Sequence, residues 1–348
     1  MHLLKPITIL LIFALLQSCK QGLKYHYAIR DFREALQPAL GEIVSKGFVD
    51  YYDTTVRFIK ANASDRELMK MSRSELPVLR AAALRLMTER PSIDNFKLIL
   101  EHLDDTAIAG VDHGEWGVEY HMVADVLIHN SKWATMADKN RTIDSVVMGH
   151  NNLESAYFIL YKLQPEEKYY AYIKKMAQQD RSFDNIEDAL YALAKYKRKK
   201  DVFLIKEKLL RNMWRLGHFP FRLLQNYPDT AYLEVFDEYS KKALYKNIKV
   251  NRSFVEAQEF FSALASYQTP KSAEILGHIL NRKPFLPPYS DSAYLLDALV
   301  GSILDNKCEA YMKLEAQIKP FVKIYPNSDS LWLPSPANVT PRPETDRW

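Results

Sequence analysis

Four side chains of types that ligate metals gather in one stretch of this sequence: His113, Glu115, His121 and His129. His121 and His129 are eight residues apart, so they would share one face of a continuous helix. Helical zinc sites place two histidines four residues apart around a glutamate, as His-Glu-x-x-His, and that motif is absent. The sequence therefore predicts a glycine-rich loop with a packed Trp116 rather than a metal site, and we assign no metal ligand.

Two other groups have residue types that can do chemistry. Lys195-Tyr-Lys-Arg-Lys-Lys200 is a basic run between two expected helices, and such a run is usually a solvated turn. If the run instead binds a ligand, the expected partners are anionic lipid head groups or cell-wall polymers. Cys308 lies in an expected helix, and the sequence shows no base to activate it, which favours a small packing residue.

Motifs that mark known catalytic and phosphate-binding sites are missing. The sequence contains no G-x-S-x-G elbow, no P-loop and no G-x-G-x-x-G, and ten glycines leave little room for phosphate-cradling loops. We therefore expect no enzymatic activity, no catalytic residue and no cofactor.

Composition and charge indicate what kind of protein this is. The chain is 47% hydrophobic and 26% charged, which is typical of a globular protein, and its formal charge of +4 is too weak to predict nucleic-acid binding. Its 348 residues are enough for a substantial core.

The first nineteen residues have the layout of a secretory signal. Lys5 precedes a ten-residue, almost wholly apolar run, Ile7 to Leu16, which is too short to span a bilayer at roughly 20 residues per helix. The following Leu16-Gln17-Ser18-Cys19 resembles the lipobox of bacterial lipoproteins, although Gln17 departs from the pattern. An uncleaved anchor and an ordinary secretory signal are the alternatives.

The resemblance implies that the chain is cut before Cys19, which becomes the lipid attachment residue, carrying diacylglycerol and an N-acyl chain. Two or more acyl chains anchor a protein stably. With Cys19 acylated, only Cys308 remains, so no intramolecular disulfide is expected. Lys20 is not the aspartate that retains lipoproteins at the inner membrane of enteric bacteria, which mildly favours the outer membrane within the cell envelope.

A small residue recurs along the chain at the same position of successive expected helices. The steps between these alanines are 41, 32, 33, 68 and 36 residues, and the 68 is two units of 34 with Leu223 in the intermediate position. The alanines are Ala83, Ala124, Ala156, Ala189, Ala257 and Ala293. A helix pair cannot bury both of its apolar faces alone, so such units must stack on neighbours.

The clearest unit begins with Leu76-Pro-Val-Leu-Arg-Ala-Ala-Ala-Leu84 and ends with Leu103-Asp-Asp105. It resembles the HEAT-repeat family more than the TPR repeat, whose first-helix signature is absent. In this unit Ser72 and Glu75 have capping-box spacing, and Phe96, Ile99, Leu100 and Leu103 would share the buried face of the second helix. The resemblance implies an all-α fold, an α-solenoid of roughly seven antiparallel helix pairs with a right-handed superhelix.

We expect five segments: a signal peptide over 1–18, a membrane tether over 19–30, an N-terminal helical cap over 31–73, HEAT-like repeats over 74–325 and a Pro-rich irregular tail over 326–348.

Together these features predict a lipid-anchored cell-envelope scaffold that binds a protein partner through its helical-repeat surface, and no nucleic acid. The insertion at 112–120 lengthens one repeat step and is the expected contact region. The alternatives are a metal-dependent lipoprotein that uses the 112–129 region and a glycan-binding one, the latter suggested by 21 tyrosines.

Overall fold

The computed structural model describes residues 24–179, 183–213, 218–242, 244, 254–282 and 290–322. The predicted signal peptide, the lipid attachment residue Cys19 and the Pro-rich tail at 326–348 lie outside the described residues. Of the expected tether, residues 24–30 are described, and they pack on the first helices. The N–H groups of His26 and Tyr27 donate to Arg73 O, and Tyr27 forms a β-bridge with Ser74.

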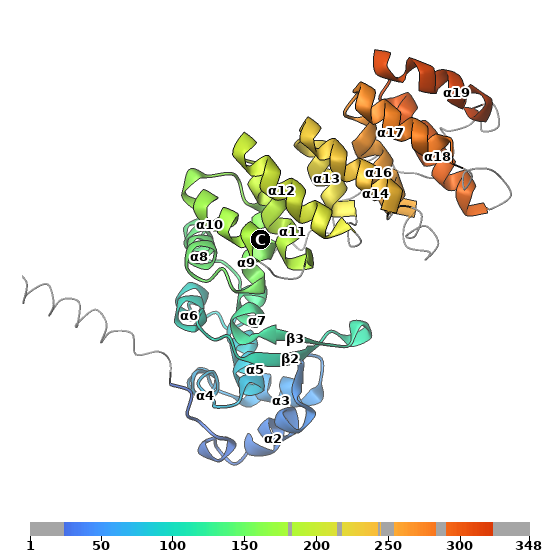
Figure 1. The fold of residues 1–348 in the computed structure, drawn as a ribbon. Coiled ribbons are helices and arrows are strands. Elements are labelled where there is room, and N and C mark those ends of the chain that lie inside the picture. The colour runs from blue at the N-terminus through green and yellow to red at the C-terminus, as the bar shows by residue number, and fades with distance from the viewer. Residues whose placement is uncertain are drawn as a thin grey trace, which may run out of the picture. The chain divides into compact units, whose positions relative to one another are not determined.

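The part of the chain that the structure describes is mostly helical, with 17 α-helices and one small three-stranded sheet (Figure 1). The expectation of a helical protein is thereby confirmed, whereas the sheet was not expected. The chain divides into two compact units between Ile159 and Leu160.

The first unit contains the sheet and the helices before the division. Its elements are η1 (Ile29–Asp31), α2 (Gln37–Lys46), β1 (Phe48–Asp50), α3 (Thr54–Asn62), α4 (Asp65–Met71), α5 (Pro77–Met87), α6 (Asn95–His102), β2 (Ile108–Asp112), η2 (Gly114–Trp116), β3 (Val118–Met122), α7 (Val123–Asn130), α8 (Met136–Gly149) and the first part of α9 (Glu154–Lys162).

The second unit is entirely helical in its described residues. It continues with α10 (Glu167–Gln178), α11 (Phe183–Ala194), α12 (Lys199–Arg211), α13 (His218–Asn226), η4 (Thr230–Tyr232), α14 (Leu233–Lys242), α16 (Phe254–Ala265), α17 (Pro270–Leu280), α18 (Ser290–Asp305), η6 (Glu309–Tyr311) and α19 (Met312–Val322).

The small residue of the predicted repeat is buried wherever its side chain is described. Ala83 of α5 and Ala156 of α9 are fully buried, and the other described members are at most 4% exposed: Ala124, Ala189, Leu223 and Ala257. Ala293 lies in α18 but outside the residues whose side chains are described. A small buried side chain lets neighbouring helices approach closely, as α5 and α7 do.

The start of α5 differs from the capping box that the sequence predicts. Ser72 is the C-cap of α4, its hydroxyl donates to Met69 O, and α5 begins only at Pro77 with Leu76 as its N-cap. The chain between the two helices makes a turn and then a single β-bridge at Ser74, where Ser74 Oγ and Glu75 N–H both donate to Tyr27 O.

The buried face of α6 also differs from the expected one, and Phe96 is only half-buried. Ile99 and Leu103 are buried as expected, but Leu100 is 41% exposed and Leu98 takes its place in the core.

A buried ion pair joins α5 to the segment after α6. Arg80 Nε donates to Asp105 Oδ2 at 2.7 Å and Arg80 Nη2 to Asp105 Oδ1 at 2.9 Å, and both side chains are at most 3% exposed. The remaining guanidinium donor, Nη1, is satisfied by the carbonyls of Ser74 and Glu75, and the ring of Tyr25 lies 3.9 Å from the guanidinium carbon. The planar fork of arginine suits this bidentate, fully bonded geometry.

The second unit buries polar groups in the same bonded manner. Asp201 of α12 accepts hydrogen bonds from Tyr170 Oη and Lys174 Nζ of α10. Ser272 Oγ and the hydroxyl of Tyr311 lie 2.8 Å apart, and that hydroxyl also donates to Ala265 O. An aromatic cluster fills the space between α13, α14 and α16, with Phe221, Phe236, Tyr239 and Phe260 all buried.

The Arg80–Asp105 pair generates a stability prediction. Arg80→Met leaves a buried carboxylate without its counter-charge, so we expect it to destabilise the protein by about 3–5 kcal/mol, whereas Arg80→Met combined with Asp105→Leu restores most of that loss. Urea denaturation followed by tryptophan fluorescence measures both. Arg33→Met, which breaks the exposed Arg33–Glu67 pair, is the control and should cost under about 1 kcal/mol. A single Arg80 variant as stable as the wild type would contradict the assignment.

Candidate functional site

The segment around 112–120, which the sequence predicts to be a loop between helices, folds as a β-hairpin. β2 pairs antiparallel with β3, with Val111 opposite Glu119 and Ala109 opposite His121. Gly114 and Gly117 close the turn at φ values of +71° and +79°, a region that side chains with a Cβ rarely adopt. His113 immediately precedes this turn, and its N–H donates to Gly117 O.

β1 fixes the hairpin to the rest of the unit by parallel pairing with β2. Gly110 lies opposite Phe48, and a Cβ built at Gly110 would come 2.9 Å from Phe48 Cβ. Glycine is therefore required for the two strands to approach at this point. Val49 and Val111 pair side by side and are buried.

Two sequence-based expectations for this region are corrected. His121 and His129 do not share a helix, because His121 belongs to β3 and α7 begins only at Val123. Trp116 is not packed: it lies at the hairpin tip and is 86% exposed. The spacing of the alanines predicts the helix around Ala124. It does not show that the residues before Val123 pair as a strand and so delay the start of α7.

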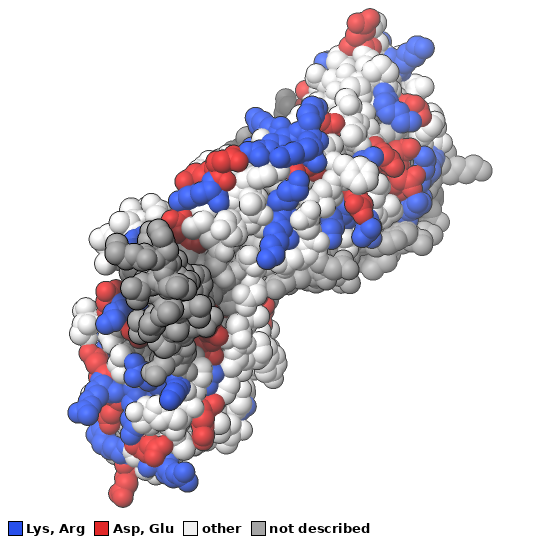
Figure 2. Space-filling view, turned by 60° about the vertical axis from the view of Figure 1, so that its left-hand side comes forward, with Lys and Arg blue, Asp and Glu red and all other residues white. Residues whose placement is uncertain are grey.

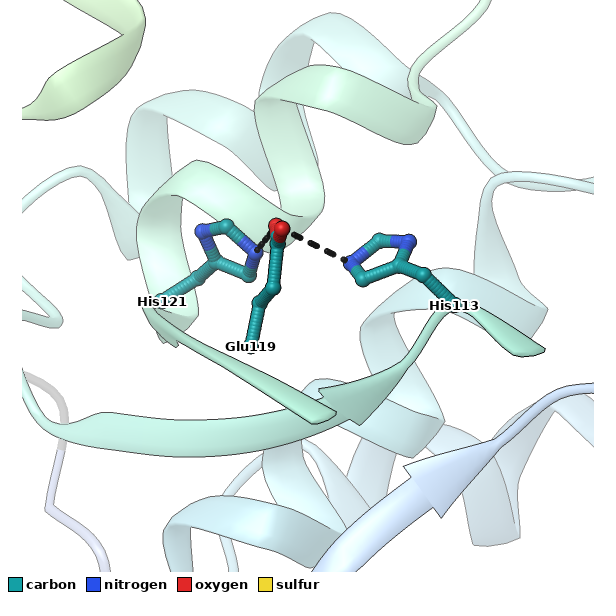
Figure 3. A group of neighbouring side chains, drawn as sticks. All are labelled: His113, Glu119 and His121. Carbon is teal, nitrogen blue, oxygen red and sulfur yellow. Dashed lines mark ion pairs between the residues drawn. The ribbon is translucent and has the colours of Figure 1, made fainter. Parts of the chain in front are cut away.

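The hairpin brings His113 and His121 together, and the carboxylate that joins them is Glu119 rather than Glu115 (Figure 3). Glu119 and His121 are two residues apart on β3, so their side chains point to the same face of the sheet. Glu119 Oε2 lies 3.4 Å from His121 Nε2 and 3.8 Å from His113 Nε2. Glu115 is exposed in η2 at the tip. The period of two along a strand is the signal that would have selected Glu119.

A second carboxylate fixes the orientation of the His121 ring. His121 Nδ1 lies 3.1 Å from Glu154 Oε2, and because an ionised carboxylate can only accept, Nδ1 must carry a proton. Glu154 is placed by the first turn of α9, whose N–H groups at Glu154 and Ser155 both donate to the buried carboxylate of Asp125 in α7. The hydrogen bond raises the pKa of His121 and lowers that of Glu154.

His129 lies behind this group. Its ring meets the His121 ring edge-on at 6.5 Å between centroids and contacts Phe158 at 5.3 Å. Burial lowers the pKa of His129, which favours its neutral form.

The cluster faces a cleft of about 730 Å³ within the first unit. The hairpin contributes His113, Glu119 and His121 to its lining, and helices contribute residues such as Val126 and Phe158. The lining also includes Tyr51, Tyr52 and the basic side chains Arg57, Lys60 and Arg85, of which Lys60 and Arg85 pair with Glu89 in the same lining. Such a cleft can admit a small ligand to the histidine and carboxylate groups.

The other face of the hairpin carries exposed apolar side chains, with Asp112 beside Val118 at its end. Ile108, Val118 and Tyr120 lie on this face and are 53%, 36% and 68% exposed. β3 is also an edge strand of the sheet as described, with order β1-β2-β3. An exposed apolar face beside an open edge marks an interaction surface.

The basic run at 195–200 covers the turn after α11 and the first two residues of α12, and three of its five charged side chains have polar partners. Lys195 Nζ donates to Leu163 O at 2.9 Å and also to Tyr161 O at the end of α9, and burial lowers its pKa to about 8. Arg198 pairs with Glu167, and Lys199 pairs with Asp229 at 2.5 Å. On the face drawn in Figure 2, Lys and Arg are interspersed with Asp and Glu. Lys195, Arg198 and Lys199 therefore join neighbouring segments, while Lys197 and Lys200 are exposed.

Cys308 and the tyrosines have packing environments. Cys308 is half-buried and lies between α18 and η6, not within a helix as the sequence predicts. Tyr191 meets Tyr161 and Tyr227 at 5.4 and 5.6 Å between ring centroids, and burial raises the pKa of Tyr227 to about 12. These rings pack on one another.

No helix among the described residues is long and apolar enough to traverse a bilayer.

The His121–Glu154 pair generates a pH prediction. A raised histidine pKa contributes stability that is complete below the unfolded-state pKa and is lost as pH rises through the folded-state value, whereas a lowered carboxyl pKa contributes stability that is lost at acid pH. The pair therefore stabilises most between about pH 4.5 and 6.5. We expect Glu154→Gln, in a chelator, to lower Tm more at pH 6 than at pH 8.5.

Thermal unfolding followed by circular dichroism at the two pH values checks this expectation. Glu115→Gln removes a neighbouring exposed carboxylate that the histidines do not contact, and it is the matched control. An equal loss of Tm at both pH values for Glu154→Gln would show that the pair does not form.

In comparisons with known proteins, the chain matches no protein-family model, no curated protein and no solved structure.

Proposed function

We propose that this chain is a lipid-anchored scaffold of the bacterial cell envelope that binds a protein partner, with the β2–β3 hairpin as the central contact. The observation that carries the proposal is the exposed apolar face of that hairpin, formed by Ile108, Val118 and Tyr120 with Trp116 at the tip. No catalytic activity is part of this proposal.

The helical part supplies the scaffold. In this proposal its helix pairs are HEAT-like repeats of an α-solenoid, each with one small buried residue in the first helix. The burial of that residue in α5, α7, α9, α11 and α16 supports the repeat interpretation. In such folds, insertions between repeats lie on the binding face, and the hairpin is an insertion of this kind between α6 and α7.

The hairpin has the composition of a protein interface. Trp and Tyr are enriched among the side chains that contribute most to binding, and Trp116 and Tyr120 are both widely exposed. The open edge of β3 also offers backbone groups to an extended segment of the partner, which would add as a further strand. A protein partner uses both features at once.

The proposed cellular location of the protein is inferred from its N-terminal sequence. The resemblance of Leu16-Gln17-Ser18-Cys19 to a lipobox supports lipidation at Cys19, and Lys20 mildly favours the outer membrane over the inner one. Residues 24–30 pack on the first helices, so the distance between lipid and folded chain would be set by the few residues from Cys19 to Leu23.

The anchor is tested by Cys19→Ala in cells labelled with palmitate. We expect the variant to lose the label and to leave the membrane fraction, because the thiol that carries the lipid is gone. Cys308→Ala, the matched control at the only other cysteine, should keep both. Unchanged labelling of Cys19→Ala would exclude the anchor.

The partner is tested by crosslinking the membrane-anchored protein in cells and identifying what copurifies by mass spectrometry. The wild type should capture one envelope protein in stoichiometric amount, and Trp116→Ala combined with Tyr120→Ala should lose it, since both rings leave the contact face. Phe203→Ala removes another aromatic ring that is 69% exposed, on α12, and should retain the partner.

Two results would contradict the proposal. One is a wild-type protein that captures no stoichiometric envelope protein under crosslinking. The other is a hairpin double variant that captures the same protein in the same amount as the wild type.

A further inference from the structure

We propose that His113, Glu119 and His121 bind one divalent transition-metal ion of the zinc class on the cleft side of the hairpin. This goes against the sequence-based expectation of no metal ligand. It is independent of the proposed function, because the partner face consists of the side chains on the opposite side of the same two strands.

The separations between the three ligand atoms fit a coordination shell better than a hydrogen-bond network. The ligand atoms all lie within 4.8 Å of one another, and the two distances to Glu119 Oε2 are 3.4 and 3.8 Å. These are long for hydrogen bonds, which centre near 2.9 Å. In a tetrahedral zinc site with bonds of about 2.0–2.1 Å, neighbouring ligand atoms lie about 3.3 Å apart. Small side-chain rotations would bring the set to that size.

The tautomer of His121 leaves the correct nitrogen available. Because Nδ1 donates to Glu154, the neutral ring presents a lone pair at Nε2 toward Glu119 Oε2. A lone pair and a carboxylate oxygen facing each other repel unless a proton or a metal ion lies between them. A metal ion at this point would accept both, together with His113 Nε2.

Glu154 completes the arrangement found around ligating histidines. Such histidines almost always donate their second ring nitrogen to a carboxylate or a carbonyl, which fixes the ring and raises its basicity. Glu154 is held in turn by α9, whose first N–H groups are bonded to the buried Asp125. This outer carboxylate comes from a different element than the ligands, so a chance pairing of neighbours in sequence does not explain it.

The donor set indicates the class of ion. Two imidazoles and one carboxylate suit zinc and its neighbours in the first transition row rather than calcium or magnesium, which prefer oxygen ligands alone. Three protein ligands leave a coordination position for water or for an anionic group of a small ligand. The set faces the 730 Å³ cleft, so a small ligand can reach that position.

The test is direct titration of the full-length protein, purified in detergent without a histidine tag and stripped with chelator. Co²⁺ is the spectroscopic probe, since its visible absorption reports coordination number, and Zn²⁺ is then titrated in competition and by calorimetry. We expect one ion per chain, a Co²⁺ spectrum of four- or five-coordinate type, and displacement by Zn²⁺.

Variants separate ligands from neighbours. His113→Ala, Glu119→Gln and His121→Ala should each weaken binding more than the roughly 10–100-fold that loss of an outer partner costs, and Glu154→Gln should fall in that range. Glu115→Gln is the matched control, because it removes a hairpin carboxylate outside the group, and it should bind as the wild type does. Circular dichroism in chelator, well below Tm, should show the same fold for all five, since none of these side chains is fully buried.

The outcomes are distinguishable. Stoichiometric binding that is lost in the three ligand variants and kept in Glu115→Gln supports the site. Absence of stoichiometric Co²⁺ or Zn²⁺ binding by the folded wild type overturns it, as does binding that His113→Ala and Glu119→Gln leave unchanged.

Discussion

The buried ion pair between Arg80 and Asp105 is the interaction on which the first unit depends. It fixes α5 to the segment after α6, and the backbone of that segment then starts the next elements: Asp105 O accepts from Ala124 N–H, and Ala107 O accepts from Val123 N–H. The hairpin begins and ends beside this segment, so the pair helps to set the start of α7, while the pairing of β1 with β2 holds the strands. Burying two charges is costly unless every donor and acceptor is satisfied, and here the guanidinium is bonded on all sides.

From this pair a continuous series of contacts leads to the histidines. α7 carries Asp125, whose buried carboxylate accepts the first N–H groups of α9 and thereby sets the position of Glu154. Glu154 orients the ring of His121, which reaches the same place from β3. Each step is a hydrogen-bonded polar group, and the series begins at the buried Asp125 and ends at the half-buried Glu154 and His121. Such groups position a site accurately because an unsatisfied alternative would cost about 1–3 kcal/mol or more.

The hairpin has two faces with different chemistry. Alternation along β2 and β3 sends Ala109, Val111, Glu119 and His121 to one side, and Ile108, Val118 and Tyr120 to the other. The first side faces the cleft and carries the groups that we propose to hold a metal ion. The second is exposed and apolar, and we propose that it contacts a protein. One insertion between two helices thus supplies both candidate sites, and the helices serve to hold it in place.

The sequence by itself determined the helical class and the positions of the small buried residues. Ala83, Ala124, Ala156 and Ala189 are buried as their spacing predicts, because helical periodicity is a local property that a single segment expresses. The same periodicity missed the exposure of Leu100 and the start of α5, where Tyr27, distant in sequence, bonds Ser74 and Glu75.

Tertiary structure decided the rest. The sheet forms because β1, some sixty residues before β2, pairs with it, and that long-range pairing converted an expected loop and helix start into strands. It also replaced Glu115 by Glu119 beside the histidines and exposed Trp116. Glu154 joins His121 across thirty-three residues, which no spacing rule within one helix or strand can anticipate. Composition and periodicity describe what a segment can form, whereas the partners of its polar groups depend on the folded chain.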